Sequence, residues 1–109
     1  MPGVFMEKQR NGGKRLYRIG VVSAMWQRLE LTDLVFSHIA DMKTALAPFM
    51  ELLPVVAGSE GEESRAVAER NGFSYTEVEN LPLGAKWNAA LSLLRDQDVD
   101  GVVILGSDD

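Results

Sequence analysis

The sequence predicts an α/β fold: an open, mostly parallel sheet built from alternating β-α units. Short apolar runs rich in β-branched residues alternate along the chain with segments whose apolar residues recur every three to four positions. The connections between them are short. Strands that alternate with helices pair in parallel through right-handed crossovers, so we expect the order β-α-β-α-β-α-β.

The first β-α unit begins with a strand expected over residues 18–24 (RIGVVSA). A helix follows, and Pro48 lies just past its expected end. Its apolar residues share one face, which should point toward the sheet. His38 lies on the same face, and we expect it to be a structural histidine. The residues of this stripe are Leu31, Leu34, Val35, His38, Ile39, Met42 and Leu46.

The second unit begins with a strand over residues 52–57 (LLPVVA). Pro54 lacks a backbone N–H, which indicates an edge position or the first residues of the strand. A short helix is expected over residues 62–70, with Asn71-Gly72 as its stop. Ser59, followed three residues later by a glutamate, is a candidate capping box for this helix.

The third unit has an alternating strand over residues 73–78 (FSYTEV) and then a helix. A fourth strand over residues 102–105 (VVIL) is apolar throughout, which is typical of a central strand covered on both faces. The helix before it carries the clearest apolar stripe, formed by Leu83, Trp87, Ala90, Leu91 and Leu94.

The segments that follow the four strands should meet at one rim, because ligands of open α/β sheets bind at the carboxyl ends of the strands. These segments are residues 23–28, 57–62, 79–80 and 106–109. Within these segments, Glu60 and Glu62 are expected to be solvated acids in the first turn of a helix, where they favour the helix dipole.

Composition narrows the function classes. The 109 residues are 46% hydrophobic and carry a formal charge of −5, which argues against non-specific nucleic-acid binding. The chain has no cysteine and one histidine, so Cys-based zinc sites, thiolate catalysis and multi-His metal sites are excluded. There is no membrane segment or secretory signal, so we expect a cytoplasmic protein. Residues 1–15 read as a flexible leader and residues 16–109 as the domain.

Several common α/β sites are missing from the sequence. The turn after the first strand (SAMWQR) has none of the glycines of a dinucleotide site and none of the acids of a phosphoryl-accepting receiver domain. The G-x-x-x-x-G-K-[ST] and G-x-S-x-G motifs are absent. What remains is the pair Asp108 and Asp109 after the last strand. Adjacent acids favour a bound cation, and Mg or Mn suits their oxygen ligands.

Four local patterns follow one another in the order seen in a known family: VVSAMWQR, PVVAGSEGEES, Asn80 with LPLGAKWNAAL, and LGSDD. Together they resemble the N-terminal, nucleotide-sugar-binding half of a GT-A glycosyltransferase, nearest to the family 2 type. LGSDD resembles the family's DxD metal motif, although Gly106 stands where its first Asp is expected. The family's base-contacting acid falls near Ala57 or Gly58, which leaves base recognition open.

The resemblance implies a donor-binding fragment of an enzyme that transfers sugar to an acceptor hydroxyl with help from a divalent metal (Mn or Mg). Its partners would be a nucleotide-diphospho-sugar donor and an unidentified acceptor, and Asp108 and Asp109 would hold the metal. The family's catalytic base would lie beyond residue 109, so we expect the chain alone to be catalytically silent. The implied nucleotide-sugar-binding residues are Ser23, Met25, Trp26, Arg28, Ser59, Asn80, Lys86 and Asn88.

Two other interpretations stay open. The chain could be a non-catalytic α/β domain that binds a ligand or partner, with Asp108 and Asp109 as a solvated acidic end. It could also be nucleotidyltransferase-like, although SAMWQR lacks the Gly-rich basic loop that such a domain would want. A sheet that ends at its fourth strand has an exposed edge, which allows a homodimer.

Overall fold

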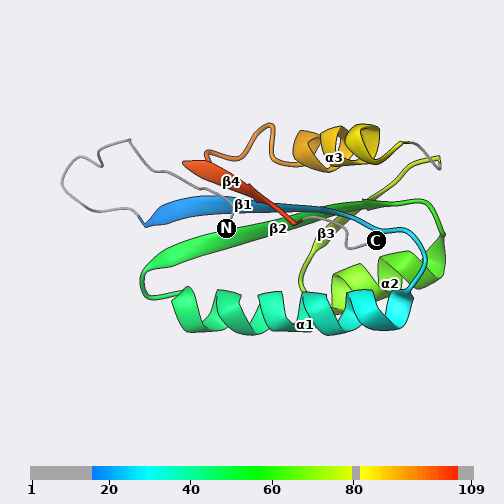
Figure 1. Cartoon of the computed structure of the whole chain (residues 1–109). Coiled ribbons are helices and arrows are strands. Elements are labelled where there is room, and N and C mark those ends of the chain that lie inside the picture. Colours follow the sequence, from blue (N-terminus) through cyan, green and yellow to red (C-terminus); the bar gives the residue numbers. More distant parts are fainter. Residues whose placement is uncertain (1–15, 80–81, 106–109) are drawn as a thin grey trace.

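The computed structural model describes residues 16–79 and 82–105. In this part of the chain, strands and helices alternate as the sequence predicts (Figure 1). The elements are β1 (Tyr17–Ala24), α1 (Leu29–Leu46), β2 (Met50–Gly58), α2 (Glu62–Arg70), β3 (Ser74–Glu77), α3 (Leu83–Ser92) and β4 (Gly101–Ile104).

The four strands form one parallel sheet in the order β3-β2-β1-β4, which confirms the predicted fold class. Helix α3 covers one face of the sheet, and α1 and α2 cover the other (Figure 1). The strand register aligns the carboxyl ends, since Ala24 of β1 pairs with Ala57 of β2 and Gly58 pairs with Glu77 of β3. The segments after these strands therefore leave the sheet at the same end.

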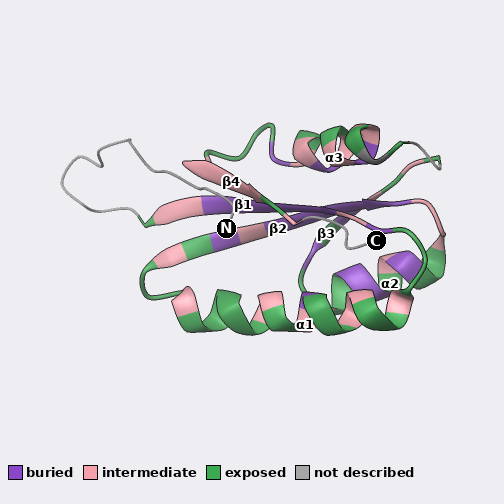
Figure 2. Cartoon of the chain, in the orientation of Figure 1, coloured by how far each residue is buried: buried purple, intermediate pink, exposed green. Residues whose placement is uncertain are grey.

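The core lies on both faces of β1 and β2, whose middle residues are buried (Figure 2). Val22 and Val55 pack toward α3 with Ala90 and Leu94. Gly20 lets α3 approach this closely, because a Cβ at Gly20 would collide with the Leu94 side chain. The predicted α3 stripe is confirmed for Trp87, Ala90, Leu91 and Leu94, all of which belong to this cluster.

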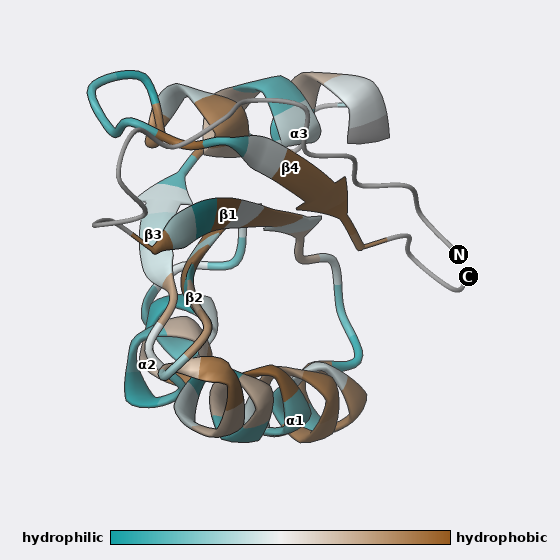
Figure 3. Cartoon of the chain, turned by 90° about the vertical axis from the view of Figure 1, so that its left-hand side faces the viewer, coloured by the Kyte–Doolittle hydropathy of each residue, from teal (hydrophilic) through white to brown (hydrophobic). Residues whose placement is uncertain are grey.

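The predicted inward face of α1 is confirmed for Ile39 and Leu46, which pack against the core, and wrong for its other five residues. His38 is exposed, as are Leu31, Leu34, Val35 and Met42. Helix α1 instead packs through Phe36, whose ring stacks on Phe73 at a centroid distance of 3.9 Å. The cause is that apolar residues surround much of α1, so their spacing fits more than one face (Figure 3).

Strand β4 is the edge of the described sheet, where the sequence predicted a central strand. Its valines are half-buried and Ile104 is 41% exposed. Pro54 lies in the middle of β2 and pairs with Val21 of β1. The ladder to β3 begins only at Val55, so on that side Pro54 has no strand partner among the described residues. The predicted edge character of Pro54 therefore holds on one side of β2.

Helix α2 begins and ends where the sequence predicts, and Gly72 adopts the left-handed φ of 83° that suits a stop signal. The capping box is wrong, because Gly61 is the N-cap residue and no side chain caps this helix. Within the described residues, no helix is both long and apolar enough to cross a membrane.

Candidate functional site

The candidate site is the rim formed by the segments that follow β1 and β2. The chain runs from β1 to β2 to β3 in one direction and then returns to place β4 on the other side of β1. The order therefore reverses between β1 and β4, and such a switch point is where doubly wound sheets bind ligands. The β1–α1 loop, Met25 to Arg28, leaves the sheet at this point.

Lys86 of α3 is the central side chain of the rim. It is only 3% exposed, although its side chain ends in an ionisable amine. Its Nζ donates hydrogen bonds to the carbonyl oxygen of Met25 (3.0 Å) and to the hydroxyl of Ser59 (3.1 Å). One side chain therefore joins α3 to the loops after β1 and β2. Among the described residues, no carboxylate forms an ion pair with Lys86.

Trp26 lies over the same ammonium group. The Nζ of Lys86 is 5.0 Å from the ring centroid of Trp26, a cation–π distance, and Trp26 is still 51% exposed. The rim thus presents a half-exposed aromatic ring that rests on a buried cation. This arrangement suits a flat, anionic ligand, which can stack on the ring while the cation stabilises its charge.

The β1–α1 loop has an unusual backbone. Gln27 and Arg28 have φ values of 56° and 49°, both in the left-handed region. For a residue other than glycine this region costs roughly 1–2 kcal/mol. The N–H of Gln27 donates to Oε1 of Glu60 at 2.8 Å, which links the loop to the β2–α2 loop. The expectation that Glu60 is a solvated first-turn acid is wrong, because α2 begins at Glu62.

A second carboxylate organises the β3 side of the rim. Glu77 accepts a hydrogen bond of 2.6 Å from the hydroxyl of Tyr75 and one of 3.3 Å from the N–H of Gly61. Burial of Tyr75, followed by its hydrogen bond to Glu77, raises the pKa of the Tyr75 phenol. The Arg65 guanidinium lies 4.9 Å from the centroid of the same ring. Sequence reasoning gave Tyr75 and Glu77 no role, because only the register brings them to Gly61.

Two opposing effects act on the pKa of the Lys86 ammonium group. Burial lowers the pKa of the Lys86 ammonium, and the nearby carboxylates of Glu60 and Glu77 act in the opposite direction. Within the described residues neither carboxylate forms an ion pair with Lys86, so both act on its pKa from a distance.

The structure brings together the side chains of three of the eight nucleotide-sugar residues implied by the resemblance. Trp26, Ser59 and Lys86 meet at the rim, and Arg28 is exposed beside them at the start of α1. Ser23 is buried within β1, and Met25 places its side chain in the core, so that only its carbonyl reaches Lys86. Asn88 is exposed on α3. Asn80, Asp108 and Asp109 lie outside the described residues.

The predicted metal site cannot be built from the described part of the chain alone. In residues 16–79 and 82–105, no group of three or more acidic or histidine side chains could hold a metal ion. Glu60 and Glu77 both face the rim, but each carboxylate accepts a backbone N–H. The predicted ligands Asp108 and Asp109 lie outside the described residues, so the metal site stays a prediction.

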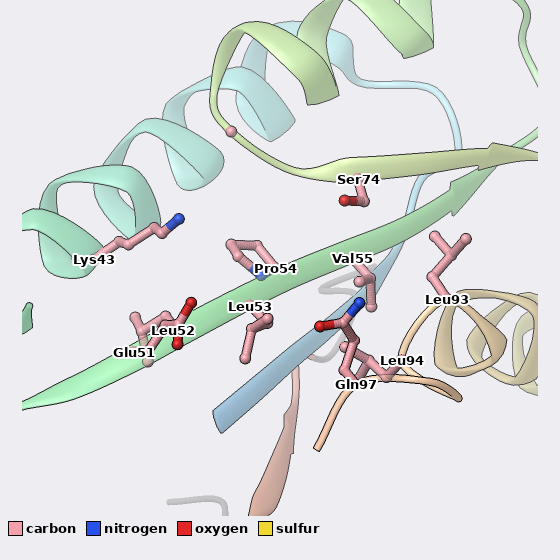
Figure 4. A pocket seen from close by; sticks show the side chains of 11 residues that line it. Lys43, Glu51, Leu52, Leu53, Pro54, Val55, Ser74, Leu93, Leu94 and Gln97 are labelled. Carbon is pink, nitrogen blue, oxygen red and sulfur yellow. The ribbon is translucent and has the colours of Figure 1, made fainter. Parts of the chain in front are cut away.

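A cavity of about 150 Å³ lies away from the rim, beside the half of β2 that has no partner in β3 (Figure 4). Lys43 and Glu51 are charged residues of its lining, and Pro54 and Leu93 form part of its apolar wall. It has neither the aromatic ring nor the loop cluster of the rim. Substitutions in this cavity therefore serve as controls for binding at the rim.

Comparisons with known proteins give no independent assignment. No protein-family model matches the sequence, and neither the curated proteins nor the solved structures contain a match.

Proposed function

We propose that the chain is the donor-binding part of a nucleotide-sugar-dependent glycosyltransferase of the GT-A type. The observation that carries the proposal is the position of Trp26 and Lys86 at the switch point between β1 and β4. Sites of this kind bind nucleotides in other doubly wound sheets. Two of the sequence patterns that resemble the GT-A family, VVSAMWQR and PVVAGSEGEES, contribute Trp26 and Ser59 to this rim, and a third contains Lys86.

In this proposal the nucleobase stacks on the exposed face of Trp26. The Lys86 ammonium, fixed by Met25 and Ser59, supplies positive charge behind the ring for the diphosphate. Arg28 and the N-terminal end of α3 add further positive potential. Because these groups are held by the protein before a ligand arrives, little reorganisation is needed for binding.

A divalent Mn or Mg held by Asp108 and Asp109 belongs to the proposal, since a diphosphate beside acidic residues calls for a cation. When bound, the metal would neutralise charge on the departing nucleoside diphosphate. The described residues contribute binding and orientation. The donor nucleotide, its sugar and the acceptor stay open.

The experiment is a thermal-shift titration of the whole chain with UDP, GDP, CDP and ADP, each with and without MnCl₂. At a ligand concentration of 100 times Kd, binding stabilises the folded state by about 2.7 kcal/mol. For a domain of this size we therefore expect a rise in Tm of several degrees with at least one nucleotide. Lys86→Met should abolish the shift, and Lys43→Met, which alters the other cavity, should retain it.

Two results would contradict the proposal. One is the absence of a shift with every nucleotide in a chain that unfolds cooperatively. The other is an equal shift in the Lys86→Met and wild-type chains, each measured against its own ligand-free Tm. The first result would favour the non-catalytic α/β binding domain, and the second would place any nucleotide site away from Lys86.

Self-association is a separate part of the proposal. The edge of β4 with its exposed Ile104 is compatible with a homodimer. Sedimentation equilibrium over a hundred-fold range of concentration tests it, with a constant monomer mass as the contradicting result.

A further inference from the structure

The β1–α1 loop is fixed at both ends and needs support between them. At its beginning, Met25 donates its N–H to the carbonyl of Ala57 and accepts from Lys86. At its end, the carbonyl of Arg28 accepts the first helical hydrogen bond, from Thr32. Between these anchors, the Gln27 N–H is held by a side chain from another loop.

That side chain, Glu60, is itself well placed to act as a support. The residue before it, Ser59, is tied to Lys86, and the N–H of the residue after it, Gly61, is held by Glu77. The β2–α2 loop is thus fixed on both sides of Glu60. A hydrogen bond from a backbone N–H to a carboxylate is stronger than one between neutral groups.

We propose that Glu60 is the positioning residue of the rim: its carboxylate holds Gln27 and Arg28 in the left-handed conformation that places Trp26 over Lys86. Neither residue is a glycine, so the backbone has no intrinsic preference for this conformation. Without the carboxylate, the loop relaxes toward ordinary φ values and Trp26 leaves the ammonium group. This inference concerns the ligand-free chain and does not depend on the proposed function.

The test measures amide hydrogen exchange and backbone chemical shifts of Gln27 and Arg28 by NMR in the full chain. In Glu60→Ala we expect exchange of the Gln27 amide to accelerate at least ten-fold and the chemical shifts of both residues to leave their left-handed values. Glu60→Gln keeps an oxygen acceptor and should restore exchange to within about three-fold of wild type. A purely electrostatic role of Glu60 would not be rescued by glutamine.

Glu62→Ala is the matched control, since it removes an acid two residues away, in the first turn of α2. It should leave Gln27 exchange unchanged. A second test replaces Gln27 and Arg28 with glycine, which adopts left-handed φ values freely. With Trp87→Phe in both chains, so that Trp26 is the only tryptophan, Glu60→Ala should perturb the fluorescence less in that background than in the wild-type background.

The inference is overturned if Glu60→Ala leaves Gln27 exchange within two-fold of wild type, or if Glu62→Ala accelerates it equally. If Glu60→Ala prevents folding of the wild-type chain, the inference predicts that the same substitution folds in the double-glycine background. Failure to fold there, while the double-glycine chain itself folds, overturns the inference. Nucleotide binding is measured separately, so its absence would count against the proposed function and not against the role of Glu60.

Discussion

The ammonium group of Lys86 donates a 3.0 Å hydrogen bond to the carbonyl oxygen of Met25, which lies 61 residues earlier in the chain. Through this bond and the bond to Ser59, α3 is joined to the loops that leave β1 and β2. A single buried side chain therefore couples helix packing on one face of the sheet to the shape of the rim.

Replacing Lys86 with methionine tests this coupling. Methionine fills similar space but leaves the Met25 carbonyl without its donor, so we expect a loss of about 1–3 kcal/mol in the free energy of unfolding. Because burial lowers the pKa of Lys86, the unfolded chain binds its proton more tightly. Wild-type stability relative to Lys86→Met should therefore rise with pH between the lowered pKa and 10.5. Urea denaturation at several pH values measures this difference in stability. A difference that does not change with pH would contradict the lowered pKa of Lys86.

Gly20 and Gly84 form a matched pair for the packing of α3. A Cβ at Gly20 would meet Leu94, whereas a Cβ at Gly84 has open space around it. We expect Gly20→Ala to destabilise the chain by about 1–3 kcal/mol, because overpacking forces the helix outward. Gly84→Ala should stabilise α3 by up to roughly 1 kcal/mol. Chemical denaturation of both variants checks the pair, and equal effects would show that α3 does not pack as described.

The Tyr75 phenol should lose its proton only at a pH above the ordinary tyrosine pKa of 10. Its pKa is raised, so the folded chain disfavours the phenolate. The stability that this gives is fully present below the ordinary tyrosine pKa of 10 and is lost as the pH rises above it. In a Tyr17→Phe variant, where Tyr75 is the only tyrosine, phenolate absorbance should appear well above pH 10, together with unfolding. A midpoint near 10 in a chain that stays folded would contradict the buried hydrogen bond to Glu77.

The exposed contact between Asp33 of α1 and Arg70 of α2 should affect the stability of the chain at acidic pH. Hydrogen bonds from Arg70 and Asn71 lower the pKa of the Asp33 carboxyl below 3.8. The stability it gives is present above the ordinary carboxyl pKa and is lost as the pH falls through the lowered value. In Arg70→Met the Asp33 pKa, followed by NMR, should rise toward 3.8. An unchanged pKa would mean that the contact does not form in solution.

The sequence predicts the order of the elements well, because each helix and strand carries its own periodicity and stop signals. Helix α2 is the best example, since Asn71 and Gly72 end it where expected. The sequence predicts the orientation of α1 only in part, because the helix is apolar on more than one side. Packing selects the face with Phe36, which the predicted stripe shares only through Ile39 and Leu46. His38 was misplaced for the same reason.

The candidate site was predictable in position and less so in its contacts. The rule that ligands bind at strand ends brings Trp26, Ser59 and Lys86 to one rim, and the structure places them there. The partners of Glu60 and Glu77 are backbone N–H groups of distant loops, which leave no pattern in the sequence. Such contacts follow from the register of the strands, which local periodicity does not specify.

The most direct test of the central claim is an NMR titration of the whole chain with nucleoside diphosphates and MgCl₂, followed on backbone amides. The account predicts that shifts concentrate at the rim, in residues 25–28 and 59–61. Shifts confined to the cavity beside β2, at Glu51 and Ser74, or no shifts with any nucleotide, would contradict it.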